Sequence, residues 1–146
     1  MTVTDQKKRT VFITGASSGI GKACAIAFAG SGARLLLCAR REDRIQDLAE
    51  QLKHEYKTDC MGFGMDVRQR AAVETAIAEL PEGWKDIDVL VNNAGLSRGL
   101  VPAQEGLVDD WDEMIDTNVK GLLYVSRSIL PGMVERGCGH VINIGS

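Results

Sequence analysis

Short apolar runs alternate with amphipathic segments along most of the chain. The apolar runs predict five strands, at residues 10–14, 33–39, 59–66, 88–92 and 141–144. Apolar positions three and four residues apart predict helices between them, at residues 20–29, 45–56, 69–80 and 109–136. Near-continuous apolar strands separated by helices indicate a parallel sheet that helices cover on both faces. The pattern therefore predicts a doubly wound α/β domain.

The last predicted helix is the longest, and two of its residues do not suit a helix. We expect Asp109 to cap it, and Pro131 and Gly132 to weaken its final turns. Asn118 and Gly121 cost several tenths and about 1 kcal/mol relative to alanine, which a helix tolerates for packing or function. Asn118 can either distort the helix and free a carbonyl for water, or be a buried amide that holds neighbouring backbone. The residues expected to face inward are Trp111, Ile115, Leu122, Val125, Ile129 and Met133.

Length and charge narrow the class of protein. A chain of 146 residues fits a single domain, and 45% hydrophobic with 25% charged residues is typical of a globular protein. The formal net charge of −3 offers no basic field, so we expect no nucleic-acid partner. No apolar run approaches the roughly 20 residues that a bilayer requires, and residues 1–10 contain no apolar signal region. We expect a cytoplasmic protein that does not bind membranes.

Cysteine and histidine usage gives no indication of a metal site. The cysteines at 24, 38, 60 and 138 form no C-x-x-C pair and no dense disulfide framework, so we expect reduced, mostly buried thiols. His54 and His140 are the only histidines, too few for an ordinary zinc site. The sequence predicts no metal.

A glycine-rich segment, TGASSGIG at residues 14–21, lies between the first strand and the first helix. Gly15 permits a sharp turn, Gly19 removes a Cβ where a phosphate approaches the backbone, and Gly21 lets helix and strand pack closely. Free N–H groups at the helix start then face the anion. A plain surface turn is the alternative, but the flanking strand and helix favour a phosphate-binding loop.

The second strand ends at Ala39-Arg40-Arg41, about 20 residues after Gly21. An NAD-binding fold places an acidic residue at the end of this strand, where it accepts a hydrogen bond from the ribose 2′-hydroxyl. No carboxylate lies at this position here. Arginine beside the positive end of a helix dipole favours an anionic partner, which a ribose 2′-phosphate supplies. The alternative is a solvated pair of arginines balanced by Glu42 and Asp43. We expect NADP rather than NAD.

Two more strand ends carry polar residues. Asp66, in Met65-Asp66-Val67, can accept from an adenine amino group or cap the next helix. The fourth strand runs into Asn92-Asn93-Ala94-Gly95, which places two amides and two small residues beside the expected groove.

Together TGASSGIG, Asp66, NNAG at 92–95, Asn118 and NIGS at 143–146 resemble the short-chain dehydrogenase/reductase family, over essentially the whole chain. The resemblance implies a Rossmann-type NAD(P) oxidoreductase that acts on alcohols and carbonyls. It assigns Gly15, Ser17, Ser18, Gly19, Ile20 and Gly21 to the pyrophosphate loop, Arg40 with Arg41 to NADP selection, Asp66 and Val67 to the adenine site, and Asn92, Ala94 and Gly95 to the loop beside the cofactor.

The resemblance also implies two catalytic residues. Asn118 matches an asparagine whose carbonyl holds a water in a proton relay, and Ser146 matches a serine that hydrogen-bonds the substrate oxygen. The family's Tyr-x-x-x-Lys pair lies about thirteen residues beyond that serine. Tyr56 and Tyr124 cannot replace it, since neither has lysine four residues later. We therefore expect the first part of a longer reductase, nearly inactive by itself and with a sheet incomplete at its C-terminal side, which forms a homo-oligomer, a dimer or tetramer, at full length.

Within that family, the stretches at 66–68, 113–118 and 130–136 resemble the NADP-dependent 3-hydroxy acid dehydrogenases, including serine dehydrogenases. Such substrates carry a carboxylate that needs a cation. Arg98 is a candidate, with an ordinary surface-loop arginine as the alternative reading. A non-catalytic NADP-binding module and an inactive or non-folding fragment are the alternatives to an enzyme.

Overall fold

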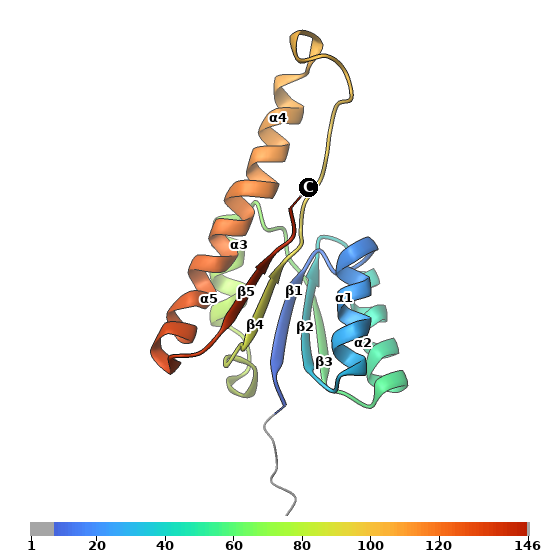
Figure 1. Cartoon of the computed structure of the whole chain (residues 1–146), viewed down its shortest axis with the longest axis vertical. Coiled ribbons are helices and arrows are strands. Elements are labelled where there is room, and N and C mark those ends of the chain that lie inside the picture. Colours follow the sequence, from blue (N-terminus) through green and yellow to red (C-terminus); the bar gives the residue numbers. More distant parts are fainter. Residues whose placement is uncertain (1–7, 146) are drawn as a thin grey trace, which may run out of the picture.

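One parallel sheet organises the chain, and the structure, a computed structural model, describes residues 8–145 of it. The strands are β1 (Thr10–Thr14), β2 (Arg34–Ala39), β3 (Cys60–Gly64), β4 (Val89–Asn92) and β5 (His140–Asn143), in the order β3-β2-β1-β4-β5 (Figure 1). All four pairings are parallel. The chain builds outward in one direction from β1 to β3, and in the other from β4 to β5. The predicted doubly wound sheet is confirmed.

Helices cover both faces of the sheet. α1 (Gly19–Gly30) and α2 (Glu42–Tyr56) pack on one face, and α3 (Arg70–Ala78) and α5 (Leu122–Arg136) on the other (Figure 1). The central strands β1, β2 and β4 are buried almost throughout because both of their faces meet a helix. Two short 3-10 turns, η1 (Glu82–Trp84) and η2 (Ala103–Glu105), lie in the connections. The helices on each face of the sheet therefore enclose a separate layer of apolar side chains.

The long predicted helix is divided into three parts. α4 (Val108–Ile115) is followed by a π-helical segment, η3 (Asp116–Gly121), and then by α5. The predicted cap at Asp109 is wrong: the helix begins at Val108 with Leu107 at the N-cap, and Asp109 lies in the first turn, where a carboxylate suits the helix dipole. Pro131 and Gly132 do not shorten α5, which continues to Arg136.

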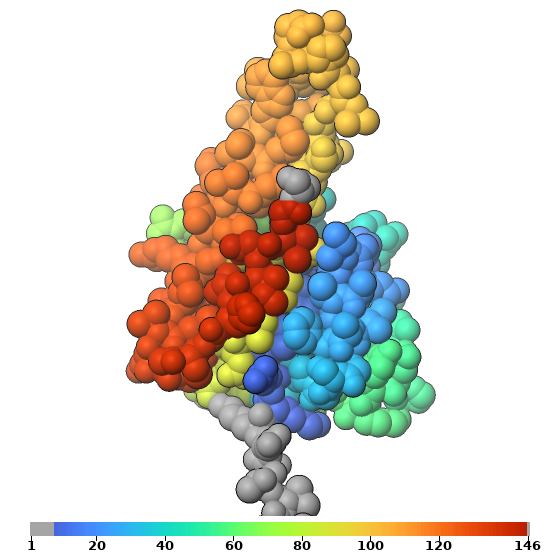
Figure 2. Space-filling model, in the orientation of Figure 1, coloured from blue at the N-terminus to red at the C-terminus, as the bar shows by residue number. Residues whose placement is uncertain are grey.

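The inward face of this helix follows the prediction only where the helix lies over the sheet. Val125, Ile129 and Met133 are buried, as predicted. Trp111 and Ile115 are 44% and 51% exposed, so their predicted inward orientation is wrong. The physical reason is that α4 projects past the ends of the strands together with the loop before it, as Figures 1 and 2 show, and has no sheet to pack on.

Apolar side chains remain exposed along this helix and at the sheet edge. Trp111, Ile115, Val119 and Leu123 follow one another at intervals of four residues, and all are exposed. β5 is an edge strand whose residues are half-buried or exposed, and Figure 2 shows it uncovered on one face. The sheet edge predicted to be incomplete thus presents unpaired backbone and partly exposed apolar side chains.

The cysteines are free, and only part of the burial prediction holds. Cys38 and Cys60 are buried, and burial raises the pKa of both thiols to about 12. Cys24 is half-buried and Cys138 is exposed. Within residues 8–145 no three His, Cys, Asp or Glu side chains gather as metal ligands. No helix in the same residues is long and apolar enough to cross a membrane.

Candidate functional site

A groove of about 950 Å³ follows the carboxyl ends of the strands. Loops after all five strands line it, together with residues of η3. It thus lies where the strand order reverses, the usual ligand position in such sheets. A second hollow, of about 470 Å³ beside β3, contains no predicted site residue. The predicted residues that line the main groove are Gly15, Ser17, Ser18, Gly19, Ile20, Arg40, Arg41, Asp66, Val67, Asn92, Ala94, Gly95 and Asn118.

Gly21, a residue predicted for the pyrophosphate loop, does not line this groove. Gly21 lies beneath it: a Cβ there would lie 2.5 Å from the carbonyl oxygen of Gly15 and against the side-chain amide of Asn93. The predicted close packing is therefore real, but its partners are the glycine loop and Asn93 rather than the strand. Ser146 lies outside the described residues.

The glycine loop leaves open space where a ligand can approach the backbone. Gly19, at the first position of α1, has a φ of +56°, and a Cβ there would meet nothing within 4 Å. Ser18 stands at the N-cap without a side-chain hydrogen bond to the helix. The first-turn N–H groups of α1 therefore face the groove without a side-chain cap, an arrangement suited to an anion.

Asn93 fastens the glycine loop to the loop after β4. Its Nδ2 donates to the carbonyl oxygens of Thr14 and Gly15, at 3.1 and 3.0 Å. The hydroxyl oxygen of Thr14 accepts from the backbone N–H groups of Asn93 and Ala94, at 3.1 and 3.0 Å. The sequence places the Asn93 amide beside the groove, where the structure also has it, but does not predict this role in holding the glycine loop.

Two buried polar atoms in the groove have no partner within the described chain. Asn92 donates through Nδ2 to Ser126 Oγ and Asn143 Oδ1, both at 2.9 Å, while its own Oδ1 is unpaired. The hydroxyl of Thr117, a residue that sequence reasoning missed, is unpaired too. Since buried polar groups are normally hydrogen-bonded, these atoms indicate a polar ligand or water in the groove.

Asp66 is held by Arg68. Its carboxylate accepts from the Arg68 backbone N–H at 3.0 Å and from the guanidinium at 2.7 to 3.1 Å. These hydrogen bonds from Arg68 hold the pKa of Asp66 below its usual range. Asp66 does not cap the following helix, because Gln69 occupies that N-cap.

Arg40 and Arg41 stand at the mouth of the groove, where β2 passes into α2. Arg41 is the N-cap residue of α2. The Arg40 side chain is 55% exposed, and its Nη1 lies 3.9 Å from Oε1 of Glu113. Glu42, one of the two carboxylates that could balance these arginines, accepts through Oε1 from Gln46.

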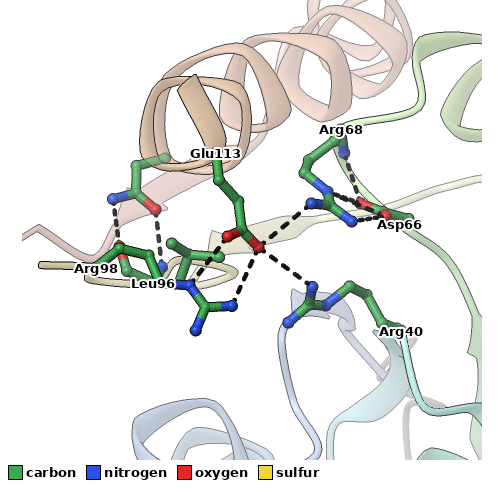
Figure 3. A network of polar contacts seen from close by, with 7 residues as sticks. Arg40, Asp66, Arg68, Leu96, Arg98 and Glu113 are labelled. Atoms are coloured by element: carbon green, nitrogen blue, oxygen red, sulfur yellow. Dashed lines mark hydrogen bonds and ion pairs between the residues drawn. The ribbon is translucent and has the colours of Figure 1, made fainter. Parts of the chain in front are cut away.

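Three arginines, each from a different loop, point toward the carboxylate of Glu113 on α4 (Figure 3). Arg98 lies 3.0 Å from its Oε2, and Arg68 3.4 Å from its Oε1, in addition to Arg40. Hydrogen bonds from Arg98, followed by the charges of the other arginines, hold the pKa of Glu113 below its usual range. Arg98 therefore faces Glu113 and does not line the groove, which weakens its candidacy as a substrate ligand.

Asn118 lies within the π-helical segment and holds a loop. Its amide forms two hydrogen bonds with the backbone of Leu96, as the second alternative expects, but the residue is exposed rather than buried, and the π-helical segment is a distortion of the kind that the first alternative expects. π-segments inside helices are frequent at functional sites.

Comparisons with known proteins agree with this geometry. The short chain dehydrogenase family matches residues 9–146. The NADP-dependent 3-hydroxy acid dehydrogenase YdfG of Salmonella typhi is 51% identical over 136 residues, which are 93% of this chain and 53% of that protein. The chain thus spans about half the length of the curated relatives it matches.

Solved structures give the same grouping. The crystal structure of serine dehydrogenase from Escherichia coli is 47% identical, with a TM-score of 0.85 over 94% of this chain and 62% of that one. The closed form of serine dehydrogenase complexed with NADP+ is also 47% identical, with a TM-score of 0.86 over 94% and 54%. Together with the glycine loop and the groove, these matches show that the chain belongs to the short chain dehydrogenase family.

Proposed function

We propose that this protein is an NADP-dependent oxidoreductase acting on the alcohol or carbonyl group of a small substrate. The observation that carries the proposal is the exposed Arg40 at the end of β2, beside the glycine loop in one groove. An NAD-specific site would place a carboxylate at this step to bind the ribose 2′-hydroxyl. A guanidinium there suits a 2′-phosphate instead.

The residues present fit this cofactor along the whole groove. The open backbone around Gly19 and the uncapped start of α1 can receive the pyrophosphate. Val67 and Asp66 line the part of the groove beside Arg40 and would flank the adenine. The unpaired oxygens of Asn92 and Thr117 supply polar contacts deeper in the groove. When bound, NADP supplies or accepts the hydride.

We infer a substrate of the 3-hydroxy acid or serine class. The support is the similarity to proteins named for these substrates. In this proposal the carbonyl of Asn118 holds a water of the proton relay, and Ser146 hydrogen-bonds the substrate oxygen. The position of Asn118 in a π-segment that lines the groove supports the first role.

Residues 1–146 contain no Tyr-x-x-x-Lys pair, since Tyr56 and Tyr124 are followed four residues later by Cys60 and Ser128. Proton transfer by a positioned side chain typically contributes 10²- to 10⁴-fold to a rate. We therefore expect the 146-residue chain alone to bind NADP with little turnover. The second candidate function, a non-catalytic NADP-binding module, uses the same groove and predicts binding without turnover.

The exposed apolar row along α4, η3 and α5 supports a homo-oligomer. Trp111, Ile115, Val119 and Leu123 present one continuous apolar strip. Exposed strips of this kind mark contact surfaces between proteins. Sedimentation of the full gene product tests this: a dimer or tetramer is expected, and a monomer contradicts it.

Fluorescence titration with NADPH and NADH tests the function, with Arg40→Ala and Arg44→Ala as a matched pair. Arg44 is an exposed arginine one turn further along α2 and does not line the groove. A hydrogen bond between charged groups contributes about 1.5–3 kcal/mol, or about 10- to 100-fold in Kd. We expect Arg40→Ala to lose this much affinity for NADPH and little for NADH, and Arg44→Ala to behave as wild type. Equal binding of both cofactors by wild type contradicts the proposal.

Turnover by the full gene product separates the two candidate functions. NADP-dependent oxidation of serine or 3-hydroxypropionate supports the enzyme. Tight NADPH binding with no turnover of any 3-hydroxy acid supports the binding module.

A further inference from the structure

One carboxylate joins three loops around the mouth of the groove. Arg40 follows β2, Arg68 follows β3 and Arg98 follows β4, and Figure 3 shows all three pointing toward Glu113 of α4. The Glu113 carboxylate lies 3.0 Å from Arg98, 3.4 Å from Arg68 and 3.9 Å from Arg40. Arg40 is thus the most distant of its three partners and also the one that lines the groove.

Arg40 is the arginine of this cluster that is held least firmly. Arg68 and Arg98 also feel the charges of Asp116 and Asp110, respectively. Asp66 is occupied by Arg68 at 2.7 Å. Glu113 is therefore the anion that faces Arg40. A long ion pair with an exposed arginine is weak, so another anion can take Arg40 from it.

We propose that Glu113 is a specificity-determining residue that competes with the 2′-phosphate of NADP for Arg40. This inference rests on the proposed function. A phosphate monoester carries about −1.5 to −2 charges near pH 7, so it binds Arg40 more strongly than a carboxylate does. On binding, Arg40 exchanges Glu113 for the phosphate.

Glu113 stays close to the phosphate after this exchange. Arg98 and Arg68 hold its carboxylate by shorter contacts that do not involve Arg40, and its side chain is only 23% exposed. The negative charge of Glu113 therefore opposes the phosphate in the bound state as well as competing for Arg40 before binding. Both effects weaken the binding of nucleotides with a 2′-phosphate and leave those without one unchanged.

Adenosine 2′,5′-bisphosphate and adenosine 5′-monophosphate are the probes that isolate the 2′-phosphate, because they differ by that group alone. Their affinities are measured by titration calorimetry for wild type, Glu113→Gln and Glu135→Gln. Glu135 is an exposed glutamate of α5 outside the groove, so its variant makes the same change of charge elsewhere. We expect Glu113→Gln to bind the 2′,5′-bisphosphate about two- to fivefold more tightly, with 5′-monophosphate affinity unchanged. The gain shrinks at high salt.

A further variant separates charge from structure. Glu113→Asp keeps the negative charge and is expected to retain the wild-type ratio of the two affinities. An unchanged ratio in Glu113→Gln, or weaker binding of the 2′,5′-bisphosphate, overturns the inference while leaving the proposed function intact. If the wild-type protein does not prefer the 2′-phosphorylated nucleotide, both the inference and the proposed function are wrong.

Discussion

The side chain of Asn118 and the backbone of Leu96 form a two-point clamp. Asn118 Oδ1 accepts from the Leu96 N–H at 2.9 Å, and Asn118 Nδ2 donates to the Leu96 carbonyl at 2.8 Å. The backbone of this loop after β4 is thereby fixed to the π-helical segment η3 on one side of the groove. Gly95 contributes by having no side chain, since a Cβ there would lie 3.2 Å from Asn118 Oδ1.

Replacing Asn118 with alanine should release this loop. The loss of hydrogen bonds of this kind costs about 1 kcal/mol each, at the lower end where the groups are exposed. We expect the Leu96 amide proton of Asn118→Ala to exchange with solvent about five- to tenfold faster, as measured by NMR, because its bond to Oδ1 is lost.

Asn118→Asp is the matched control. It keeps an acceptor for the Leu96 N–H but sets a carboxylate oxygen against the Leu96 carbonyl, so the Leu96 amide should be less protected than in wild type and more protected than in Asn118→Ala. Equal exchange rates in wild type and Asn118→Ala would show that the clamp does not restrain the loop.

Gly121 and Gly132 should respond to alanine with opposite signs. Both lie in helical segments, where alanine is favoured by about 1 kcal/mol. At Gly121 a Cβ would lie 2.6 Å from Cγ2 of Val67, and such overpacking costs about 1–3 kcal/mol. At Gly132 the nearest atom is the flexible end of Arg136, at 3.1 Å. We expect Gly121→Ala to lower the free energy of unfolding and Gly132→Ala to raise it.

Urea unfolding monitored by circular dichroism measures both changes. Val67→Ala combined with Gly121→Ala should be less destabilised than the sum of the two single variants, because the smaller side chain removes the clash. A stabilised Gly121→Ala would mean that the helix can move away from Val67 at little cost.

Gly21→Ala should disturb the floor of the groove. The added Cβ would lie 2.5 Å from the Gly15 carbonyl oxygen and against Nδ2 of Asn93, so the clasp between the glycine loop and the β4 loop must open. We expect a loss of about 1–3 kcal/mol in the free energy of unfolding, together with weaker NADPH binding. Gly83→Ala, which has open space around it and an ordinary φ, should change neither quantity. A wild-type midpoint for Gly21→Ala in urea unfolding would contradict this account.

The arginine cluster should make stability depend on pH in the acid range. The pKa values of Glu113 and Asp66 lie below their ordinary values of 4.5 and 3.8 because Arg98 and Arg68, respectively, donate to them. A carboxyl group with a lowered pKa contributes stability that is fully present above its unfolded-state pKa and is lost as the pH falls through the folded-state pKa. We expect Tm to fall as the pH drops below about 5.

Glu113→Gln tests which carboxyl group is responsible. It should unfold at a lower Tm than wild type at pH 7 and show a smaller loss on acidification, so that the two curves approach each other as the pH falls. Scanning fluorimetry between about pH 7 and pH 3 provides both curves. Parallel curves would exclude Glu113 as a source of the acid dependence.

The sequence alone determined the order of strands and helices and the parallel sheet. Strands such as β1 and β2 are buried on both faces, so their apolar runs need no knowledge of their neighbours to be recognised. It also indicated the groove residues, because the carboxyl ends of parallel strands meet at one edge and each loop there is local to its strand.

Contacts between residues far apart in the chain were decided by the tertiary structure. Glu113 is one acidic residue among several on α4, and nothing in its neighbourhood predicts that arginines 15, 45 and 73 positions earlier surround it. The clasp of Asn93 on Thr14 spans 79 positions in the same way. The helical pattern could not reveal that α4 extends beyond the sheet, so Trp111 and Ile115 keep the spacing of a buried face while remaining exposed. Periodicity reports which side of a helix is apolar; whether another element covers that side depends on where the sheet ends.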